Sequence, residues 1–166
     1  MSTSPQIRRR FADLAHGQVH YREAGAGEPV LFLHASPGSS RQLSGMISDF
    51  AARYHVIAPD TPGNGDSEPL PVVTPEIPDL AAATLEFMDA VGLDRVTVYG
   101  SHTGAAVAAE LAILAPDRIK GIIPDGVLTL SPEKLQDYLE HYAHPFEADL
   151  DGTYLLKAFM FCRDQY

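Results

Sequence analysis

The residues best suited to chemistry lie in the stretch 98–106, which reads VYGSHTGAA. Gly100 and Gly104 follow a β-branched run and precede small residues, a pattern typical of a strand that turns sharply into a helix. Such a turn presents the side chain between the glycines at the end of the strand, where a nucleophile can reach a substrate. His102 takes this central position, which a serine takes in Gly-x-Ser-x-Gly, and the serine stands one residue earlier at Ser101.

Three roles are open for His102. A neutral imidazole is a competent nucleophile or base, so the ring could meet the substrate itself. Ser101 could be the nucleophile with His102 as its base, but we expect adjacent residues in a tight turn to point apart, against this pairing. The third role is structural, with a buried ring that hydrogen-bonds to the pocket and makes no covalent bond.

Two further loops place polar residues directly after apolar runs. Residues 34–39 read HASPGS, and residues 60–67 read DTPGNGDS. If the runs before them are parallel strands, both loops and the turn at 100–104 lie at the carboxyl ends of strands, where open α/β sheets bind ligands. The sequence therefore predicts one site built from three loops.

Continuously apolar runs predict the strands, because strands covered on both faces are apolar throughout. These runs are Pro29–His34, His55–Ala58, Val96–Tyr99 and Ile119–Ile123. Residues 43–50, 80–91 and 104–115 have helical spacing, and the last is apolar nearly all round, which predicts a buried helix. Strands that alternate with helices predict an α/β fold, with a mostly parallel sheet and flanking helices. Ahead of them, residues 1–10 are predicted as a loose leader, and residues 18–21 as a half-buried strand.

The last part of the chain differs in character. Ser131 is a good N-cap for a helix that begins at Pro132. A second amphipathic helix is predicted over residues 152–166, where it reaches the last residue without a glycine or proline. Little of the chain remains to cover its apolar face. We therefore expect a core over residues 1–130, a helical segment over 131–166, and a polypeptide that ends before its fold does.

In this order and spacing, the three loops resemble those of the α/β-hydrolase family. Residues 34–37 are similar to its oxyanion loop, residues 60–67 to the loop after the next strand, and residues 100–104 to its nucleophile elbow. The resemblance covers about residues 17–127 and is to the N-terminal portion of capped members, such as haloalkane dehalogenases, epoxide hydrolases and esterases. It implies that residues 131–166 begin a helical cap and that the last two strands of the core are missing.

The resemblance implies a role for each residue that matches a motif. The backbone N–H groups of Ser36 and Thr103 would form the oxyanion hole. His34 would be structural, and Asp60 would hold the adjacent loop. Asp125 stands where some members keep the acid of the catalytic triad, although Asp-Gly is also a common turn pair.

Two departures from the family pattern concern the chemistry directly. Ala35 replaces the usual glycine of the oxyanion loop, and His102 replaces the nucleophile. Family members continue for two more strands and helices, which supply the usual acid and the general-base histidine. None of the seven histidines lies in such a late loop, so the sequence has no complete Ser–His–acid constellation.

Three functions follow as alternatives. The resemblance favours a hydrolase of a small, fairly apolar substrate, by ester-type hydrolysis or a related lyase reaction, with His102 at the elbow. The second alternative is a binding protein that admits a substrate-like ligand without turning it over. The third is a truncated chain without independent activity, in which residues 118–125 form an exposed apolar sheet edge. Such an edge predicts a homo-oligomer or a complementing chain.

Composition argues against other classes of partner and cofactor. A formal net charge of −10 disfavours nucleic acid and anionic lipid surfaces. No segment reads as a secretory signal or a membrane span, so we expect a cytoplasmic protein. The single cysteine, Cys162, rules out an internal disulfide, and no histidine pair has metal spacing with a carboxylate. A dinucleotide fingerprint fails because His102 blocks its second glycine, so neither metal nor cofactor is expected.

Overall fold

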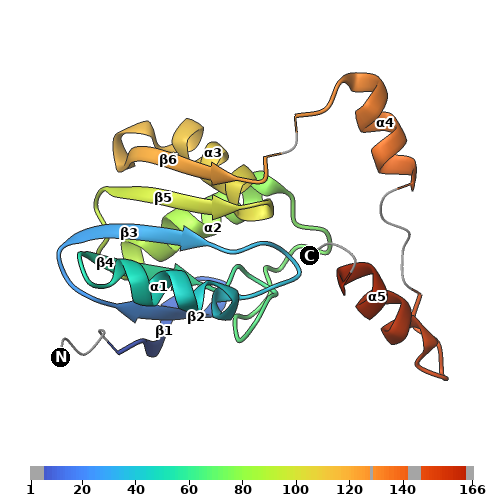
Figure 1. Cartoon of the computed structure of the whole chain (residues 1–166), viewed down its shortest axis with the longest axis horizontal. Coiled ribbons are helices and arrows are strands. Elements are labelled where there is room, and N and C mark those ends of the chain that lie inside the picture. The colour runs from blue at the N-terminus through green and yellow to red at the C-terminus, as the bar shows by residue number, and fades with distance from the viewer. Residues whose placement is uncertain (1–5, 128, 142–146, 164–166) are drawn as a thin grey trace. The chain divides into compact units, whose positions relative to one another are not determined.

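A computed structural model describes residues 6–127, 129–141 and 147–163 (Figure 1). The chain divides into two compact units, residues 1–127 and residues 128–166. All strands of the described residues belong to the first unit, and the second contains two helices. Whether the second unit is the beginning of a cap remains a prediction.

The first unit is built on a six-stranded sheet in the order β1-β2-β4-β3-β5-β6 (Figure 1). Four of its strands run parallel to one another: β3 (Glu28–Leu33), β4 (Tyr54–Pro59), β5 (Val96–Ser101) and β6 (Ile119–Asp125). The other two are β1 (Arg8–Leu14) and β2 (Gly17–Ala24), where β2 pairs antiparallel with both β4 and β1. The predicted α/β class with a mostly parallel sheet is confirmed.

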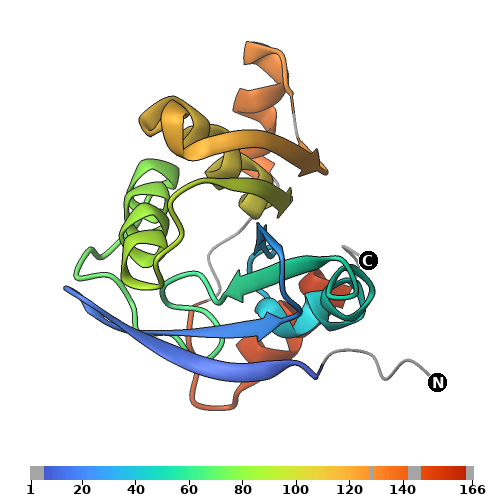
Figure 2. The same cartoon turned by 90° about the vertical axis from the view of Figure 1, so that its left-hand side faces the viewer.

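Helices cover both faces of this sheet (Figure 2). One face carries α2 (Ile77–Ala90) and α3 (Thr103–Leu114), and the other carries the 3₁₀ helix η1 (Ser40–Leu43) and α1 (Ser44–Phe50). A short 3₁₀ helix, η2 (Pro116–Arg118), leads into β6. β3 shows why the core has two parts: Leu31 and Leu33 pack on the α2/α3 side, while Phe32 packs on the α1 side, as strand alternation requires.

The prediction of a loose leader over residues 1–10 is wrong for its last three residues. Arg8, Arg9 and Arg10 begin β1 and pair with β2. Charged side chains suit a strand at the edge of a sheet, because they face water and discourage further pairing. Here they also find partners, since Arg10 forms an ion pair of 2.5 Å with Glu23 and Arg9 forms one with Asp66.

The helix after the elbow and the last strand are less covered than their apolar sequences predict. In α3, Leu111 is fully buried, whereas Ile113 is 75% exposed because it lies on the side away from the sheet. In β6 only Ile119 is buried, and Ile123 is 50% exposed. The reason is position, since β6 is the edge strand of the sheet that the structure describes.

The second unit consists of α4 (Pro132–His141) and α5 (Thr153–Arg163). The hydroxyl of Ser131 accepts a hydrogen bond of 3.4 Å from the backbone N–H of Lys134, as expected for an N-cap. Residues 164–166 of the second predicted helix lie outside the described residues. None of the helices in the described ranges has the length and apolar character needed to cross a membrane.

Candidate active site

His102 joins β5 to α3 in a strained backbone conformation. Its φ is 49° and its ψ is −107°, and among the described residues it is the one non-glycine residue with a positive φ. These angles lie outside the small left-handed region that L-residues tolerate. A conformation of this kind costs about 1–3 kcal/mol and persists only when its surroundings hold it in place.

The two glycines of the motif allow the backbone to close around this turn. A Cβ on Gly100 would lie 2.2 Å from the carbonyl oxygen of Gly104, which is backbone of α3. A Cβ on Gly104 would lie 2.3 Å from the carbonyl oxygen of Leu33, at the end of β3. Both glycines are therefore required because α3 begins directly against the ends of two central strands.

The end of β6 holds His102 from the other side. The backbone N–H of His102 donates a 2.7 Å hydrogen bond to the carbonyl oxygen of Asp125. The imidazole lies against Gly126, where an added Cβ would be 2.9 Å from both Nδ1 and Cε1. The side chain of His102 is exposed, not buried as its structural role would require.

The expectation that Ser101 and His102 point apart is wrong. The hydroxyl oxygen of Ser101 lies 3.1 Å from Nδ1 of His102, within hydrogen-bonding distance. The positive φ at His102 is the physical reason, because rotation about the N–Cα bond turns the imidazole away from the direction, relative to Ser101, that a regular strand would give it. Sequence reasoning from regular strand geometry could not anticipate this contact.

The carboxylate of Asp125 contacts Tyr99, a residue that the sequence analysis missed. The Tyr99 hydroxyl donates a 2.8 Å hydrogen bond to Oδ2 of Asp125. Burial raises the pKa of Tyr99, and the Asp125 carboxylate raises it further, while a hydrogen bond from Ser101 acts in the opposite direction. The available signal was strand alternation, which places Tyr99 and Ser101 on the same face of β5.

The predicted oxyanion residues lie next to each other. The backbone N–H of Ser36 points at the hydroxyl of Thr103 across 3.5 Å, a long contact that a substrate oxygen could replace. Thr103 is the first residue of α3, where backbone N–H groups have no partner within the helix. Their role in an oxyanion hole remains a prediction.

His34 supports the loop that carries Ser36. The ring is fully buried, and its Nε2 accepts hydrogen bonds from the backbone N–H (2.9 Å) and the hydroxyl (3.1 Å) of Thr61. Because Nε2 must accept, the proton sits on Nδ1 and is donated to the carbonyl oxygen of Ala35 at 2.8 Å. Burial lowers the pKa of His34, which keeps the ring neutral.

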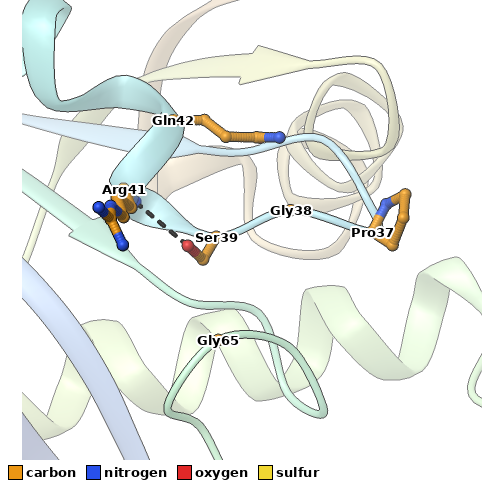
Figure 3. A pocket seen from close by; sticks show the side chains of 6 residues that line it. All are labelled: Pro37, Gly38, Ser39, Arg41, Gln42 and Gly65. Carbon is orange, nitrogen blue, oxygen red and sulfur yellow. Dashed lines mark hydrogen bonds between the residues drawn. The ribbon is translucent and has the colours of Figure 1, made fainter. Parts of the chain in front are cut away.

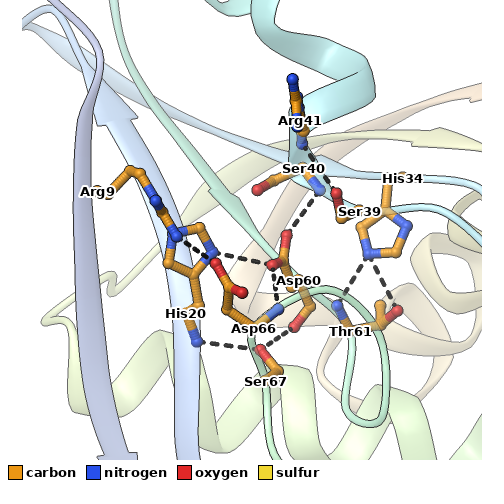
Figure 4. Close-up of polar contacts among 10 residues, drawn as sticks. All are labelled: Arg9, His20, His34, Ser39, Ser40, Arg41, Asp60, Thr61, Asp66 and Ser67. Atoms are coloured by element: carbon orange, nitrogen blue, oxygen red, sulfur yellow. Dashed lines mark hydrogen bonds and ion pairs between the residues drawn. The ribbon is translucent and has the colours of Figure 1, made fainter.

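Asp60 connects the loops that follow β3 and β4 (Figure 4). Its buried carboxylate accepts hydrogen bonds from the backbone N–H groups of Ser40 (2.7 Å) and Asp66 (3.0 Å) and from Nδ1 of His20 (2.9 Å). Burial alone would raise the pKa of Asp60, but these hydrogen bonds together outweigh it and hold the pKa below its usual value. Asp60 therefore fixes the loops around the site without facing the substrate.

His20 was not among the residues singled out from the sequence, although it is fully buried in this network. Ligand atoms of His20, Asp60 and Asp66 lie within 4.8 Å of one another, a spacing that could suit a cation. Arg9 already donates to Nε2 of His20 at 3.1 Å and pairs with Asp66 (Figure 4). Because Nδ1 of His20 donates to Asp60, both ring nitrogens are engaged, and the cluster is a structural network.

An open pocket of about 510 Å³ lies along the loop that follows β3 (Figure 3). Its lining residues are Pro37, Gly38, Ser39, Arg41, Gln42 and Gly65. His102 is not one of them. The pocket is therefore distinct from the elbow at residues 100–104.

The family assignment follows from this geometry together with comparison with known proteins. The sequence profile described as alpha/beta hydrolase fold matches residues 28–163, and the chain belongs to this family. A crystal structure of an epoxide hydrolase from Vigna radiata superposes with a TM-score of 0.73 at 25% identity, covering 81% of this chain and 46% of the other.

Two curated relatives give the same class. Haloalkane dehalogenase 2 of Mycobacterium tuberculosis is 32% identical over 114 residues, which cover 69% of this chain and 40% of the relative. A 2-hydroxy-6-oxononadienedioate/2-hydroxy-6-oxononatrienedioate hydrolase of Dechloromonas aromatica is 34% identical over 142 residues, which cover 80% of this chain and 47% of the relative. The chain spans less than half the length of either relative.

Proposed function

We propose that this chain contains the nucleophile elbow of a hydrolase that acts on a small, fairly apolar ester-type or related substrate. In this proposal His102 is the residue that reacts with the substrate. The observation that carries the proposal is the strained backbone of His102. Strain of this size is retained where function requires a side chain to be presented in one direction. The imidazole occupies that place and is exposed.

The reaction that fits these groups is nucleophilic catalysis by a neutral imidazole. Nε2 of His102 attacks the carbonyl carbon, and the oxygen that becomes negative accepts hydrogen bonds from the N–H groups of Ser36 and Thr103. The ester C–O bond then breaks, the departing alkoxide takes the Nδ1 proton of the acylated ring through solvent, and a neutral acyl-imidazole remains. Water attacks the acyl carbon, its hydroxyl group leaves as part of the acid, and its other proton returns to the imidazole of His102.

The relatives support a small organic substrate without naming it. They are a haloalkane dehalogenase, a hydrolase of 2-hydroxy-6-oxononadienedioate and an epoxide hydrolase. Each of these names refers to a small organic molecule. The net charge of −10 agrees with a partner that is neither nucleic acid nor an anionic membrane.

The test is turnover by the protein with its native continuation, measured on short acyl esters, haloalkanes, epoxides and lactones. His102→Ala should lower kcat by about 100-fold or more, the range expected when a positioned acid–base or nucleophilic group is removed. His55→Ala is the matched control, because His55 bonds to Glu23 at 2.7 Å and is remote from the elbow in the strand register. Absence of turnover, together with no effect of His102→Ala, would refute the proposal.

A second candidate is a binding protein that holds a substrate-like ligand without turnover. The contact between the Ser36 N–H and the Thr103 hydroxyl favours it, because a side chain then occupies one of the oxyanion donors. A ligand at 100 times its Kd should raise the free energy of unfolding by about 2.7 kcal/mol. A thermal-shift screen with non-hydrolysable ester and epoxide analogues that gave no shift would remove this candidate.

A further inference from the structure

The pocket along the loop that follows β3 contains a positive charge without an acidic partner (Figure 3). The Arg41 guanidinium, which carries several N–H donors, lines this pocket. Among the described residues no carboxylate forms an ion pair with Arg41. This is notable in a chain with 22 acidic and 12 basic residues, where Arg9, Arg10 and Arg118 all have acidic partners. The charge of Arg41 is therefore available to a bound anion.

Ser39 and Gly65 add hydrogen-bond donors from the loops that follow β3 and β4. Within the parts of the chain that the structure describes, no acceptor is found for the backbone N–H of either residue. The Ser39 hydroxyl accepts a long bond of 3.4 Å from the backbone N–H of Arg41, so its own proton remains available. An anion with two oxygens could use the guanidinium and these donors together.

The two acidic side chains next to Gly65 already have partners. The buried carboxylate of Asp60 accepts three hydrogen bonds, and the carboxylate of Asp66 pairs with Arg9. Because their oxygens are engaged, these acids neither pair with Arg41 nor offer ligands to a cation. The pocket therefore favours an anion.

Contacts that need no ligand hold the two loops in place. A Cβ on Gly65 would lie 2.9 Å from Cβ of Ser39, so the loops touch at this point. A Cβ on Gly38 would lie 2.2–2.4 Å from the amide atoms of Gln42, so this side chain packs directly on the loop backbone. Asp60 also accepts backbone hydrogen bonds from both loops. A site formed in advance loses less entropy when its ligand binds.

We propose that this pocket binds the carboxylate of a small organic acid, with Arg41 as its main partner and Ser39 and Gly65 as further donors. Its volume of about 510 Å³ is typical of small-molecule sites. A planar carboxylate matches the guanidinium with two parallel hydrogen bonds. The net charge of −10 favours a singly charged carboxylate over a doubly charged phosphate, because repulsion grows with the charge of the ligand. The site goes beyond the proposed function, since neither His102 nor turnover enters the argument.

Butyrate and butyramide are matched probes for this site, because they have similar shapes and only butyrate is charged. Calorimetry measures their affinities, and the amide ¹H–¹⁵N shifts of labelled protein locate them. Butyrate should shift the resonances of Ser39 and Gly65, and it should bind about tenfold or more tightly than butyramide, since only butyrate forms charged hydrogen bonds. Inorganic phosphate should bind more weakly than butyrate.

Variants of Arg41 test its part in binding, and its exposed side chain allows substitution without disturbing the core. Arg41→Gln should weaken butyrate binding by about tenfold or more. Arg41→Lys keeps the charge but loses the planar arrangement of donors, so it should restore only part of the affinity. Arg53→Gln is the matched control and should leave the affinity unchanged. It removes the same charge from an exposed residue directly before β4, at the opposite end of that strand from the loop of Gly65.

Several results would overturn the inference. They are an absence of butyrate binding, equal binding of butyrate and butyramide, tighter binding of phosphate, and full affinity in Arg41→Gln. Shifts confined to Ser36, Thr103 and the rest of the elbow would also overturn it, because the carboxylate would then lie in the proposed oxyanion hole. None of these measurements needs turnover, so this site and the proposed function can fail separately.

Discussion

The strain at His102 predicts an unusual ranking of two small substitutions. Both His102→Ala and His102→Gly remove the imidazole, so the difference between them isolates the backbone. Alanine keeps the cost of φ 49° and ψ −107°, about 1–3 kcal/mol, whereas glycine releases it. Glycine also loses more conformational entropy on folding than alanine, which lowers the stability of the glycine variant by about 0.5–1 kcal/mol. The glycine variant should therefore be more stable than the alanine variant by about 1 kcal/mol at the middle of these ranges and by about 2.5 kcal/mol at most.

Urea denaturation followed by circular dichroism measures this difference, and thermal melting should show the same order, with a gap of a few degrees. The control is Ala109→Gly on the exposed side of α3, where the helical backbone reverses the sign and glycine should cost about 1 kcal/mol. If the alanine variant proves as stable as the glycine variant, position 102 is unstrained, and the argument from strain to function fails.

Three further outcomes are expected. Asp60→Ala should lower the free energy of unfolding by about 3 kcal/mol or more, measured by urea denaturation, because it leaves two buried donors and one partly buried donor without an acceptor. A loss below about 1 kcal/mol would contradict this. Because the pKa of His34 is lower in the folded chain than in the unfolded chain, protonation of His34 favours unfolding, and the urea midpoint should fall as pH drops below about 6.5. This fall should be smaller in His34→Gln. An equal fall in both proteins would contradict the role given to His34. Because β6 is an edge strand with the exposed residue Ile123, the 166-residue chain should self-associate through this edge, which light scattering measures. Ile123→Lys should reduce the association. A stable monomer of the unmodified chain would contradict this prediction.

Much of the fold could be predicted from the sequence because its signals are local. Continuous apolar runs marked β3, β4 and β5, and the glycine pair at 100 and 104 marked the turn into α3. The strand β1 was missed because three consecutive arginines do not look like a strand. The arginines are held by backbone pairing with β2 and by ion pairs to Glu23 and Asp66, and Asp66 lies 57 positions away in the sequence, where no local pattern indicates a partner.

The candidate site could be predicted only as a set of loops. Loop positions follow from strand order, which brought Ser36, Asp60 and His102 to the carboxyl ends of their strands. The contacts among side chains do not follow from it. Tyr99 meets Asp125 because their strands are neighbours in register, and Ser101 meets His102 because the backbone departs from regular geometry. His20 meets Asp60 across 40 positions of sequence, a separation at which no pattern carries information.

Close main-chain approaches at Gly100 and Gly104 and a hydrogen bond from the His102 N–H to Asp125 shape the elbow. None of these contacts uses the side chain at position 102. A single codon change there could install an alcohol, a thiol or a carboxylate in the same orientation without rebuilding the sheet. The reactive group at position 102 can thus change while the fold stays the same. Proteins with this fold can therefore come to catalyse different reactions without a change in their architecture.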